Sequence, residues 1–204
     1  MRCTHKQEEL TRSLGYLLVA GVDEAGRGSL FGPVYATAVI LDPARRIRGL
    51  ADSKVLSPER RCELAIIIRQ RSVAWAIGTA DAAEIDQINI YQASRLAMRR
   101  AVAALCPLPD YLLIDALTID WECPQRGIIR GDAQVACIAA ASILAKTSRD
   151  ACMEEMDRKY PGYGLARHKG YPTREHHAAL LSLGVTDQHR LTYAPVAAAA
   201  QVRQ

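Results

Sequence analysis

The chain has 204 residues, of which 50% are apolar and 24% are charged, with 13 glycines and 9 prolines. This balance suits one globular domain around one core and excludes a disordered, collagen-like or coiled-coil protein. The net charge of +4 is compatible with a polyanionic partner but does not require one. The uncharged run at 133–145 is shorter than a bilayer span, and the polar N-terminus does not resemble a secretion signal, so we expect a cytoplasmic protein without a membrane segment.

The first half of the chain alternates strand and helix signals. Apolar runs at 14–22 and 33–41 predict two strands, joined as a hairpin across a glycine-rich segment. A Ser-Pro pair predicts a helix over 57–71, and a third strand follows at 73–79. The capping pattern Asp-x-x-Glu at 81–84 then opens a long helix that ends near residue 105.

The second half continues the alternation. An apolar strand at 111–115 ends on a carboxylate, and Ile128 and Ile129 indicate another short strand. A long helix follows over 133–158, whose three consecutive alanines suit close packing on the sheet, and a last helix over 173–184 ends at a glycine. We therefore predict one α/β domain with a mixed sheet.

Six cysteines are scattered along the chain without a C-x-x-C pair. We expect reduced, mostly core thiols rather than a disulfide framework or a zinc site. They are Cys3, Cys62, Cys106, Cys123, Cys137 and Cys152. The histidines His176, His177 and His189 lack zinc-binding spacing and are expected at the surface or in hydrogen bonds.

A basic stretch runs from Arg158 to Arg174. It contains five basic residues, one histidine and three tyrosines, and no acidic residue. This composition predicts an electropositive strip with aromatic rings, which is typical of a nucleic-acid contact.

Asp23 and Glu24 close the first predicted strand, directly before Gly26-Arg27-Gly28. Two acids at a strand end, beside glycines that admit a ligand to the backbone, suit a metal ion next to a phosphate or sugar. Because neighbouring strand side chains point to opposite faces, one acid would contribute through its carbonyl unless the strand has already ended. The alternative is a solvated acidic turn. A dinucleotide-binding loop is disfavoured, because β-type sequence follows rather than a helix.

Asp115 and Asp132 are two further candidate acids. Taken alone, Asp115 could serve a turn and Asp132 could cap the alanine-rich helix. Taken with Asp23 and Glu24, they supply the hard oxygen ligands that Mg²⁺ or Mn²⁺ prefers. Two such ions roughly 3.5–4 Å apart can activate a water and stabilise the leaving oxygen of a phosphodiester.

Ser142, Lys146 and Arg149 share one face of the alanine-rich helix. A hydroxyl and two cations in a row could receive successive phosphates. The alternative is a solvated face on which Lys146 pairs with Asp150. Two further polar candidates for contacts to a nucleic-acid backbone are Lys54 and Asn89.

Six motifs follow one another in a fixed order. They are Gly-Val-Asp-Glu-Ala-Gly-Arg-Gly at 21–28, Asp-Ser-Lys at 52–54, Leu-Leu-Ile-Asp at 112–115, Gly-Asp at 131–132, Ala-Ala-Ala-Ser-Ile-Leu-Ala-Lys-x-x-Arg-Asp at 139–150 and His-Lys-Gly-Tyr at 168–171. Together, from about residue 16 to Pro195, they resemble bacterial ribonuclease HII. The resemblance implies one RNase H-like domain over 1–204, with a helical C-terminal part at about 160–195 and a flexible tail at 196–204.

The resemblance also implies an activity. Ribonucleases of this family hydrolyse the RNA strand of RNA–DNA hybrids and nick 5′ of single ribonucleotides in duplex DNA, leaving 3′-hydroxyl and 5′-phosphate ends, as ribonucleotide excision repair requires. By motif, Asp23, Glu24, Asp115 and Asp132 would be the catalytic acids. The first three would hold one Mn²⁺ or Mg²⁺ ion, and Asp132 would complete the site, for a second ion once substrate is bound.

Substrate recognition is implied in the same way. The backbone of Gly26-Arg27-Gly28 would read the ribose 2′-hydroxyl, Tyr171 would stack on the neighbouring deoxyribose, and Lys169 of the same motif would also contact substrate. Ser29 and Phe31 depart from the Pro and Ala expected in the first loop. No clamp-binding motif is evident at the C-terminus, so no protein partner is expected.

Two rival functions stay open at this point. Another RNase H-like nuclease, such as a junction resolvase, would need the acids but would be insensitive to the ribose. A non-catalytic nucleic-acid-binding module would use the basic stretch and would make no metal-dependent product.

Overall fold

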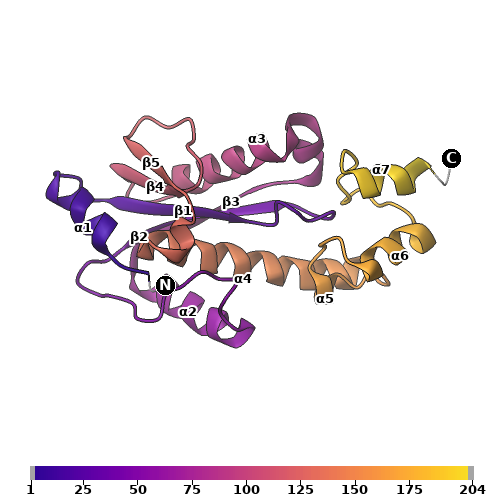
Figure 1. The fold of residues 1–204 in the computed structure, drawn as a ribbon, viewed down its shortest axis with the longest axis horizontal. Coiled ribbons are helices and arrows are strands. Elements are labelled where there is room, and N and C mark those ends of the chain that lie inside the picture. Colours follow the sequence, from indigo (N-terminus) through magenta and orange to yellow (C-terminus); the bar gives the residue numbers. More distant parts are fainter. Residues whose placement is uncertain (1–2, 202–204) are drawn as a thin grey trace.

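The computed structural model describes residues 3–201 and is built on a mixed five-stranded sheet (Figure 1). The strands are β1 (Val19–Ala25), β2 (Val34–Leu41), β3 (Ser72–Ala80), β4 (Tyr111–Asp115) and β5 (Gln125–Ile128), in the order β3-β2-β1-β4-β5. The first three strands are antiparallel, whereas β4 runs parallel to both β1 and β5. Because β1 and β4 are parallel neighbours, acids that close them lie at the same edge of the sheet.

Helices cover both faces of this sheet. They are α1 (Lys6–Ser13), α2 (Pro58–Arg71), α3 (Ala82–Ala103), α4 (Ala136–Lys159), α5 (Leu165–His168), α6 (Arg174–Leu183) and α7 (Ala194–Gln201), with a 3₁₀ turn, η1, at Gly131–Ala133. Helix α3 packs on one face, whereas α2 and α4 pack on the other, and α6 and α7 lie beyond the end of the sheet (Figure 1). The predicted mixed sheet flanked by helices is confirmed.

Helix α4 lies against β1 with almost no side chain between them. A Cβ atom on Gly21 would lie 2.1 Å from the carbonyl carbon of Cys137, so only glycine fits there. The three alanines at 139–141 are all fully buried, as expected for a helix that packs closely on the sheet. This contact sets the position of α4 relative to the strand that carries Asp23.

Local capping signals located several helices correctly. Helix α2 begins at Pro58, where the Ser57 side chain accepts from Arg60 N, and α6 begins after Thr173, which caps it in the same way. Asp81 and Glu84 form the capping box of α3. These signals depend on neighbours in the sequence, which is why they were readable without the fold.

Other predicted boundaries were wrong. The first strand begins at Val19 rather than at residue 14, and Leu14 and Leu17 are exposed. Helix α1 was not predicted, because it turns Glu8 and Thr11 inward rather than an apolar stripe. Helix α4 begins at residue 136, since a 3₁₀ turn occupies the expected start.

The expected flexible tail is also wrong for residues 196–201. These residues belong to α7, where Val196 and Ala199 are buried in a small core with Leu30 and Leu180. Alanine favours helix, and this packing provides the burial that holds it. Residues 202–204 of the predicted tail lie outside the described residues.

The expectation of mostly core thiols is corrected as well. All six cysteines are free, but Cys137 alone is buried, whereas Cys62 and Cys106 are exposed and the others are half-buried. Apart from Cys137, the cysteines lie on helices and loops at the surface or at the margin of the core. None of the helices within residues 3–201 is both long and apolar enough to cross a membrane.

Candidate active site

The four predicted acids gather where β1, β4 and η1 meet. Asp23 and Glu24 lie near the end of β1, Asp115 closes β4, and Asp132 lies in η1. The Oδ1 atom of Asp115 accepts a 2.7 Å hydrogen bond from the backbone N–H of Gly131, which joins the end of β4 to η1. The alternative that Asp132 caps the alanine-rich helix is excluded, because Val135 occupies the N-cap position of α4 and makes no side-chain cap.

These carboxyl groups share one electrostatic environment. Burial, followed by the charges of Glu24 and Asp115, raises the pKa of Asp23 well above its usual range. Burial also raises the pKa of Glu24, against the opposing effect of Arg27 and with a further rise from Asp115. For Asp132, burial and then Asp52 and Asp115 raise the pKa. Like charges held together out of water favour a cation between them.

The alternative of a solvated acidic turn is excluded for Asp23. Its residue surface is only 4% exposed, and β1 continues through Ala25, so the pair of acids stays in pleated strand. Asp23 Oδ1 accepts a 2.7 Å hydrogen bond from the backbone N–H of Glu24, and the Ser142 side chain on α4 partly offsets the rise in the Asp23 pKa. Asp23 is therefore fixed against α4.

Cationic side chains face the acids from two directions. Lys54 Nζ lies 3.9 Å from Asp132 Oδ2, and Arg27 Nη1 lies 3.4 Å from Glu24 Oε1. Burial alone would lower the pKa of Lys54, but the surrounding acids, Asp132 and Asp52 foremost, outweigh it and raise that pKa. Lys54 remains largely exposed, so it offsets only part of the negative charge.

The donor set fits a divalent cation by its chemistry. Glu24 Oε2 is buried without a hydrogen-bond partner in the described structure, which is unfavourable for a carboxylate unless it binds an ion. The carboxylates are oxygen donors of the kind that Mg²⁺ and Mn²⁺ prefer. Within residues 3–201, no three His, Cys, Asp or Glu side chains are already placed to hold a metal ion together. The acidic side chains would therefore have to move closer to one another when the ion binds.

A pocket of about 430 Å³ adjoins the acids and collects most of the predicted substrate residues. It is lined by Glu24, Ala25, Gly26, Arg27, Ser53, Lys54, Ser142, Lys146 and Tyr171. Segments that are distant in the sequence, from β1, the loop at 52–54, α4 and the segment before α6, contribute to it. The structure thus brings these predicted residues together at one place.

The glycine loop forms one wall of this pocket. Gly26 has a φ of +95°, and a Cβ there would lie 2.0 Å from Arg149 Nε, so both conformation and space require glycine. A Cβ on Gly28 would instead lie 3.9 Å from the Tyr171 ring, which is ordinary contact. The loop and the tyrosine are therefore neighbours across the pocket.

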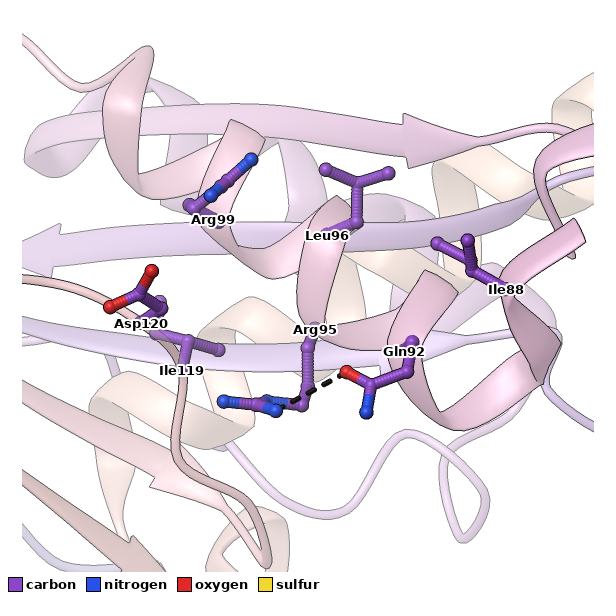
Figure 2. A pocket seen from close by; sticks show the side chains of 7 residues that line it. All are labelled: Ile88, Gln92, Arg95, Leu96, Arg99, Ile119 and Asp120. Atoms are coloured by element: carbon purple, nitrogen blue, oxygen red, sulfur yellow. Dashed lines mark hydrogen bonds between the residues drawn. The ribbon is translucent and has the colours of Figure 1, made fainter.

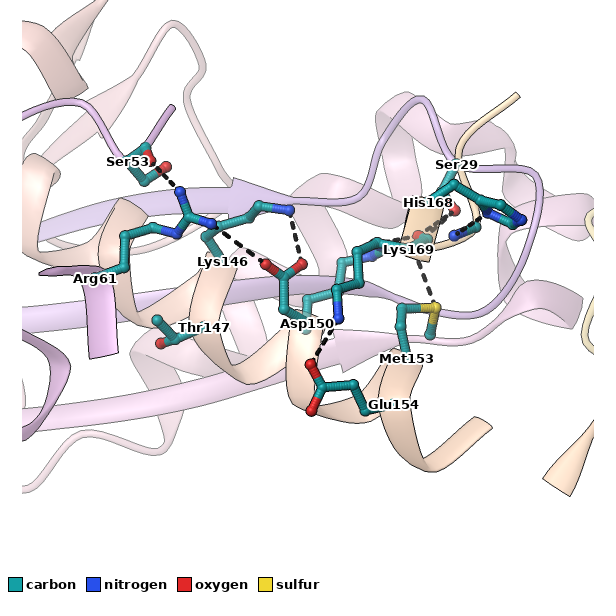
Figure 3. Close-up of polar contacts among 12 residues, drawn as sticks. Ser29, Ser53, Arg61, Lys146, Thr147, Asp150, Met153, Glu154, His168 and Lys169 are labelled. Atoms are coloured by element: carbon teal, nitrogen blue, oxygen red, sulfur yellow. Dashed lines mark hydrogen bonds and ion pairs between the residues drawn. The ribbon is translucent and has the colours of Figure 1, made fainter. Parts of the chain in front are cut away.

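Lys146 adopts the ion pair that the sequence offered as an alternative. Its Nζ lies 2.7 Å from Asp150 Oδ1, and Figure 3 shows Arg61 approaching the same carboxylate, with Arg61 Nη2 3.8 Å from Asp150 Oδ2. The ammonium also lies 5.8 Å from the Tyr171 ring centroid, within cation–π range. Lys146 therefore still lines the pocket although its ammonium is paired with Asp150.

Arg149 is not available for a substrate phosphate, which corrects its predicted role. Its side chain is fully buried and donates to the carbonyls of Pro33, Phe31 and Lys169 and to the Ser29 hydroxyl. A helical face predicted from spacing alone could not show that the third residue would point into a packed interface.

Two other predicted contacts lie apart from the pocket lining. Asn89 lies at a kink in α3, where its Oδ1 accepts from the backbone N–H groups of Tyr91 and Gln92. Lys169 pairs with Glu154 at 2.7 Å, as Figure 3 shows. Substrate contacts by these two residues stay predictions.

The basic stretch at 158–174 does not form one exposed surface, and that prediction is corrected. Tyr163 is buried in a core cluster beside Phe31, and Arg167 pairs with Glu175. Chain folding across α5 and α6 divides the stretch between solvent and interior. Only individual side chains of this stretch are therefore open to solvent.

Three residues that were not among the predicted site residues lie beside the site: Asp52, Ser53 and Arg61. The Ser53 and Ser142 hydroxyls lie 3.0 Å apart, Asp52 raises the pKa of Asp132, and Arg61 donates to the Ser53 carbonyl at 3.0 Å. Ser53 and Asp52 belong to the Asp-Ser-Lys motif, which could have indicated them. Arg61 carried no signal in the sequence.

A second pocket, of about 740 Å³, lies between α3 and the segment after β4 (Figure 2). It is lined by Ile88, Gln92, Arg95, Leu96, Arg99, Ile119 and Asp120. None of the predicted site residues is among them. The pocket beside the acids is therefore the candidate active site.

Comparison with known proteins agrees with this arrangement. The family model "Ribonuclease HII" matches residues 20–196. Ribonuclease HII of Solibacter usitatus is 56% identical over 97% of this chain and 86% of its own length, and that of Koribacter versatilis is 52% identical over 96% and 77%.

Solved structures share the fold. Ribonuclease H2 of Pyrococcus horikoshii aligns with a TM-score of 0.78 at 24% identity, covering 91% of this chain and 98% of that one. A ribonuclease HIII solved in complex with Mn²⁺ aligns with a TM-score of 0.68 at 20% identity, covering 95% and 72%. The two likenesses show the RNase H-like fold, and the sequence matches show that the chain belongs to the ribonuclease HII family, the ribonuclease H-type endonucleases.

Proposed function

We propose that this endonuclease cuts RNA–DNA hybrids and nicks duplex DNA on the 5′ side of a single embedded ribonucleotide, leaving 3′-hydroxyl and 5′-phosphate ends. The observation that carries the proposal is one pocket lined by Glu24, by Gly26 and Arg27 of the loop and by Tyr171. The charges of the other three acids act on one another and on Glu24 directly beside it. Ribonucleotide excision repair in the cytoplasm is the setting that such a product suits.

Asp23, Glu24 and Asp115 would hold one Mg²⁺ or Mn²⁺ ion, with Asp132 completing the site for a second when substrate is bound. When bound, such ions lower the pKa of a water and stabilise the charge on the leaving oxygen. The chain's own part is to present carboxylates whose mutual repulsion a cation relieves, with the orphaned Glu24 oxygen among them.

The 26–28 loop would supply the discrimination between ribose and deoxyribose. Glycines at 26 and 28 leave the backbone N–H and carbonyl groups open to the sugar. A site that hydrogen-bonds a hydroxyl can reject the analogue lacking it by about 10⁴-fold or more. Tyr171, across the pocket, would stack on the adjacent deoxyribose, so that the site reads the junction between RNA and DNA.

Ser142 and Lys54 have supporting parts. The Ser142 side chain lines the pocket and favours the charged form of Asp23, while the exposed ammonium of Lys54 can meet a phosphate beside Asp132. Lys146 can do the same from the other side of the pocket, where it also lies near the Tyr171 ring.

The experiment compares a labelled DNA duplex carrying one ribonucleotide with the same duplex in all-DNA form. The protein should produce a single nick 5′ to the ribose with Mg²⁺ or Mn²⁺ and none with chelator. Asp23→Asn should reduce cleavage by at least about 10³-fold, because it removes one of the buried carboxylates that hold the ion. Asp120→Asn, an exposed acid in the second pocket, is the matched control and should cut normally.

Three outcomes would redirect the proposal. Equal cutting of both duplexes would favour a nuclease insensitive to ribose, such as a junction resolvase. Binding without any metal-dependent product would favour a non-catalytic module. Full activity of the Asp23→Asn variant would remove the acids from the reaction.

A further inference from the structure

We infer that Arg149 is a positioning residue that couples the two arms of the ribose-reading site, the 26–28 loop and Tyr171. The inference rests on the proposed function, because it assumes that these two arms contact the sugar and its neighbour. It assigns to a buried side chain a part in substrate choice, without contact to the substrate itself.

The guanidinium contacts the first arm at Gly26 and bonds the segment that directly follows it. Arg149 Nη2 donates to the Ser29 hydroxyl at 2.7 Å and to the Phe31 carbonyl at 3.2 Å, and Nε donates to the Pro33 carbonyl at 3.3 Å. The side chain occupies the space that a Cβ on Gly26 would need. The position of the loop backbone is thus set by the position of Arg149.

The second arm is held by the same group. Nη1 donates to the carbonyl of Lys169 at 2.9 Å, two residues before Tyr171, and Cζ lies 5.5 Å from the Tyr171 ring centroid. Figure 3 places Ser29 beside the segment that carries His168 and Lys169. Leu30 N also donates to the Gly170 carbonyl at 2.9 Å, so the two arms touch where the guanidinium spans them.

Arg149 is a buried charge without a carboxylate partner, which is unusual for an arginine that serves stability alone. Arg149 is fully buried, and its hydrogen-bond acceptors are carbonyls, a hydroxyl and the Met153 sulfur rather than a carboxylate. A buried charge with neutral acceptors is costly, and a fully apolar contact would be simpler for stability alone. A planar fork of five donors can reach acceptors in both arms at once, which a lysine ammonium or a methionine cannot do.

Ser29 completes the coupling in this chain. Its hydroxyl accepts from Arg149 and donates to the Phe31 carbonyl at 2.9 Å. The resemblance to ribonuclease HII leads one to expect proline at this position, which has no hydroxyl. Phe31, the other departure, is fully buried against Tyr160 and His189 and anchors the end of the loop.

The test measures kcat/KM on two substrates: the single-ribonucleotide duplex and a uniform RNA–DNA hybrid. Only the first offers Tyr171 a deoxyribose next to the ribose. Arg149→Met should lower kcat/KM on the single-ribonucleotide duplex about tenfold more than on the hybrid, and Arg149→Lys should recover little of it. In a Tyr171→Ala background the additional loss from Arg149→Met should shrink to less than about threefold, because the coupled arm is already gone.

Arg190→Met is the matched control. Arg190 is also fully buried and donates to the carbonyls of Gly32 and Arg27, but not to the Lys169 segment. Its effect should be additive with Tyr171→Ala and similar on both substrates. If Arg149→Met does not fold, Ser29→Ala replaces it in the test, because it keeps the arginine and removes one of its hydrogen-bond acceptors. This variant should lower kcat/KM on the single-ribonucleotide duplex about threefold more than on the hybrid.

The outcomes separate this inference from the proposed function. If the unaltered protein does not prefer ribose, the proposed function fails. If it does, equal losses on both substrates or additivity between Arg149 and Tyr171 changes would show a merely structural arginine and overturn the inference.

Discussion

Gly26 and Gly28 stand two residues apart in the same loop, yet their surroundings differ. Gly26 combines a left-handed backbone with contact to Arg149, whereas Gly28 has neither a positive φ nor a crowded Cβ position. The motif alone gives both glycines the same importance. At the residue scale, the structure separates a glycine required by the fold from one that leaves room beside Tyr171.

We expect Gly26→Ala to lower the free energy of unfolding by more than about 1 kcal/mol, because alanine is strained at this φ and its Cβ would displace Arg149. Gly28→Ala should change it by less than about 0.5 kcal/mol. Urea denaturation of the two variants measures the difference. Equal stability of both variants would contradict the requirement for glycine at position 26 beside Arg149.

At the scale of elements, α3 contains a break that its hydrophobic pattern does not reveal. Asn89 has φ 66° and ψ 163°, a conformation sparsely populated by residues other than glycine, inside an otherwise continuous helix. Its side chain accepts from Tyr91 N at 3.0 Å and Gln92 N at 3.1 Å, so it caps the second half of α3. The hydrogen bonds of the Asn89 cap thus offset the strain of its backbone.

Asn89→Ala should therefore destabilise the protein by about 1–2 kcal/mol through loss of the cap. Asn89→Gly also loses the cap but relieves the backbone, so its melting temperature should lie between those of the alanine variant and the unaltered protein. Gln87→Ala, at an exposed position before the break, serves as the control. If the glycine variant were less stable than the alanine variant, the backbone at residue 89 would not be strained.

At the scale of the whole molecule, the C-terminal part buries a cluster of histidines beside its apolar contacts. His176 and His189 are buried, with their Nε2 atoms 3.3 Å apart, and His168 stacks on His176 with ring centroids 4.6 Å apart. His176 Nδ1 also lies 3.1 Å from the Tyr171 carbonyl. This cluster therefore links α6 to the segment that carries Tyr171.

The histidine cluster predicts a pH dependence of stability. Burial lowers the pKa of His176 and of His189 to about 4, with further lowering from neighbouring imidazoles and an opposing effect of Asp187 on His189. Between the ordinary pKa of about 6.5 and pH 4, the unfolded chain binds more protons than the folded one. Stability is thus full above pH 6.5 and is lost as the pH falls toward 4, by roughly 3 kcal/mol for each imidazole.

Chemical denaturation at several pH values between 7 and 4 tests this dependence. The slope should become shallower in His189→Gln and stay unchanged in His177→Gln, whose side chain is exposed. Comparing variants removes the contribution of the acid cluster, which is common to all of them. If the free energy of unfolding of His189→Gln depended on pH as steeply as that of the unaltered protein, His176 and His189 would not be a buried, neutral pair.

The sequence by itself determined the order of the five strands and of the helices α2, α3, α4 and α6, together with the residue types of the site. The caps at Ser57, Asp81 and Thr173 act on backbone groups within three residues, so their helices were predictable from local chemistry. The motifs containing Asp23 and Asp115 indicated the acids, since strand ends of parallel neighbours share one sheet edge.

Only the tertiary structure decided what each candidate contacts. Arg149 and Tyr163 carry polar groups that suit a surface by type, but both are buried, and backbone carbonyls 20 or more residues away accept hydrogen bonds from them. By sequence position alone Asp132 could equally have capped a helix, but it lies in a 3₁₀ turn with Lys54 Nζ 3.9 Å from its carboxylate. Burial and charge pairing depend on residues distant in sequence, and neither spacing nor local propensity encodes those distances.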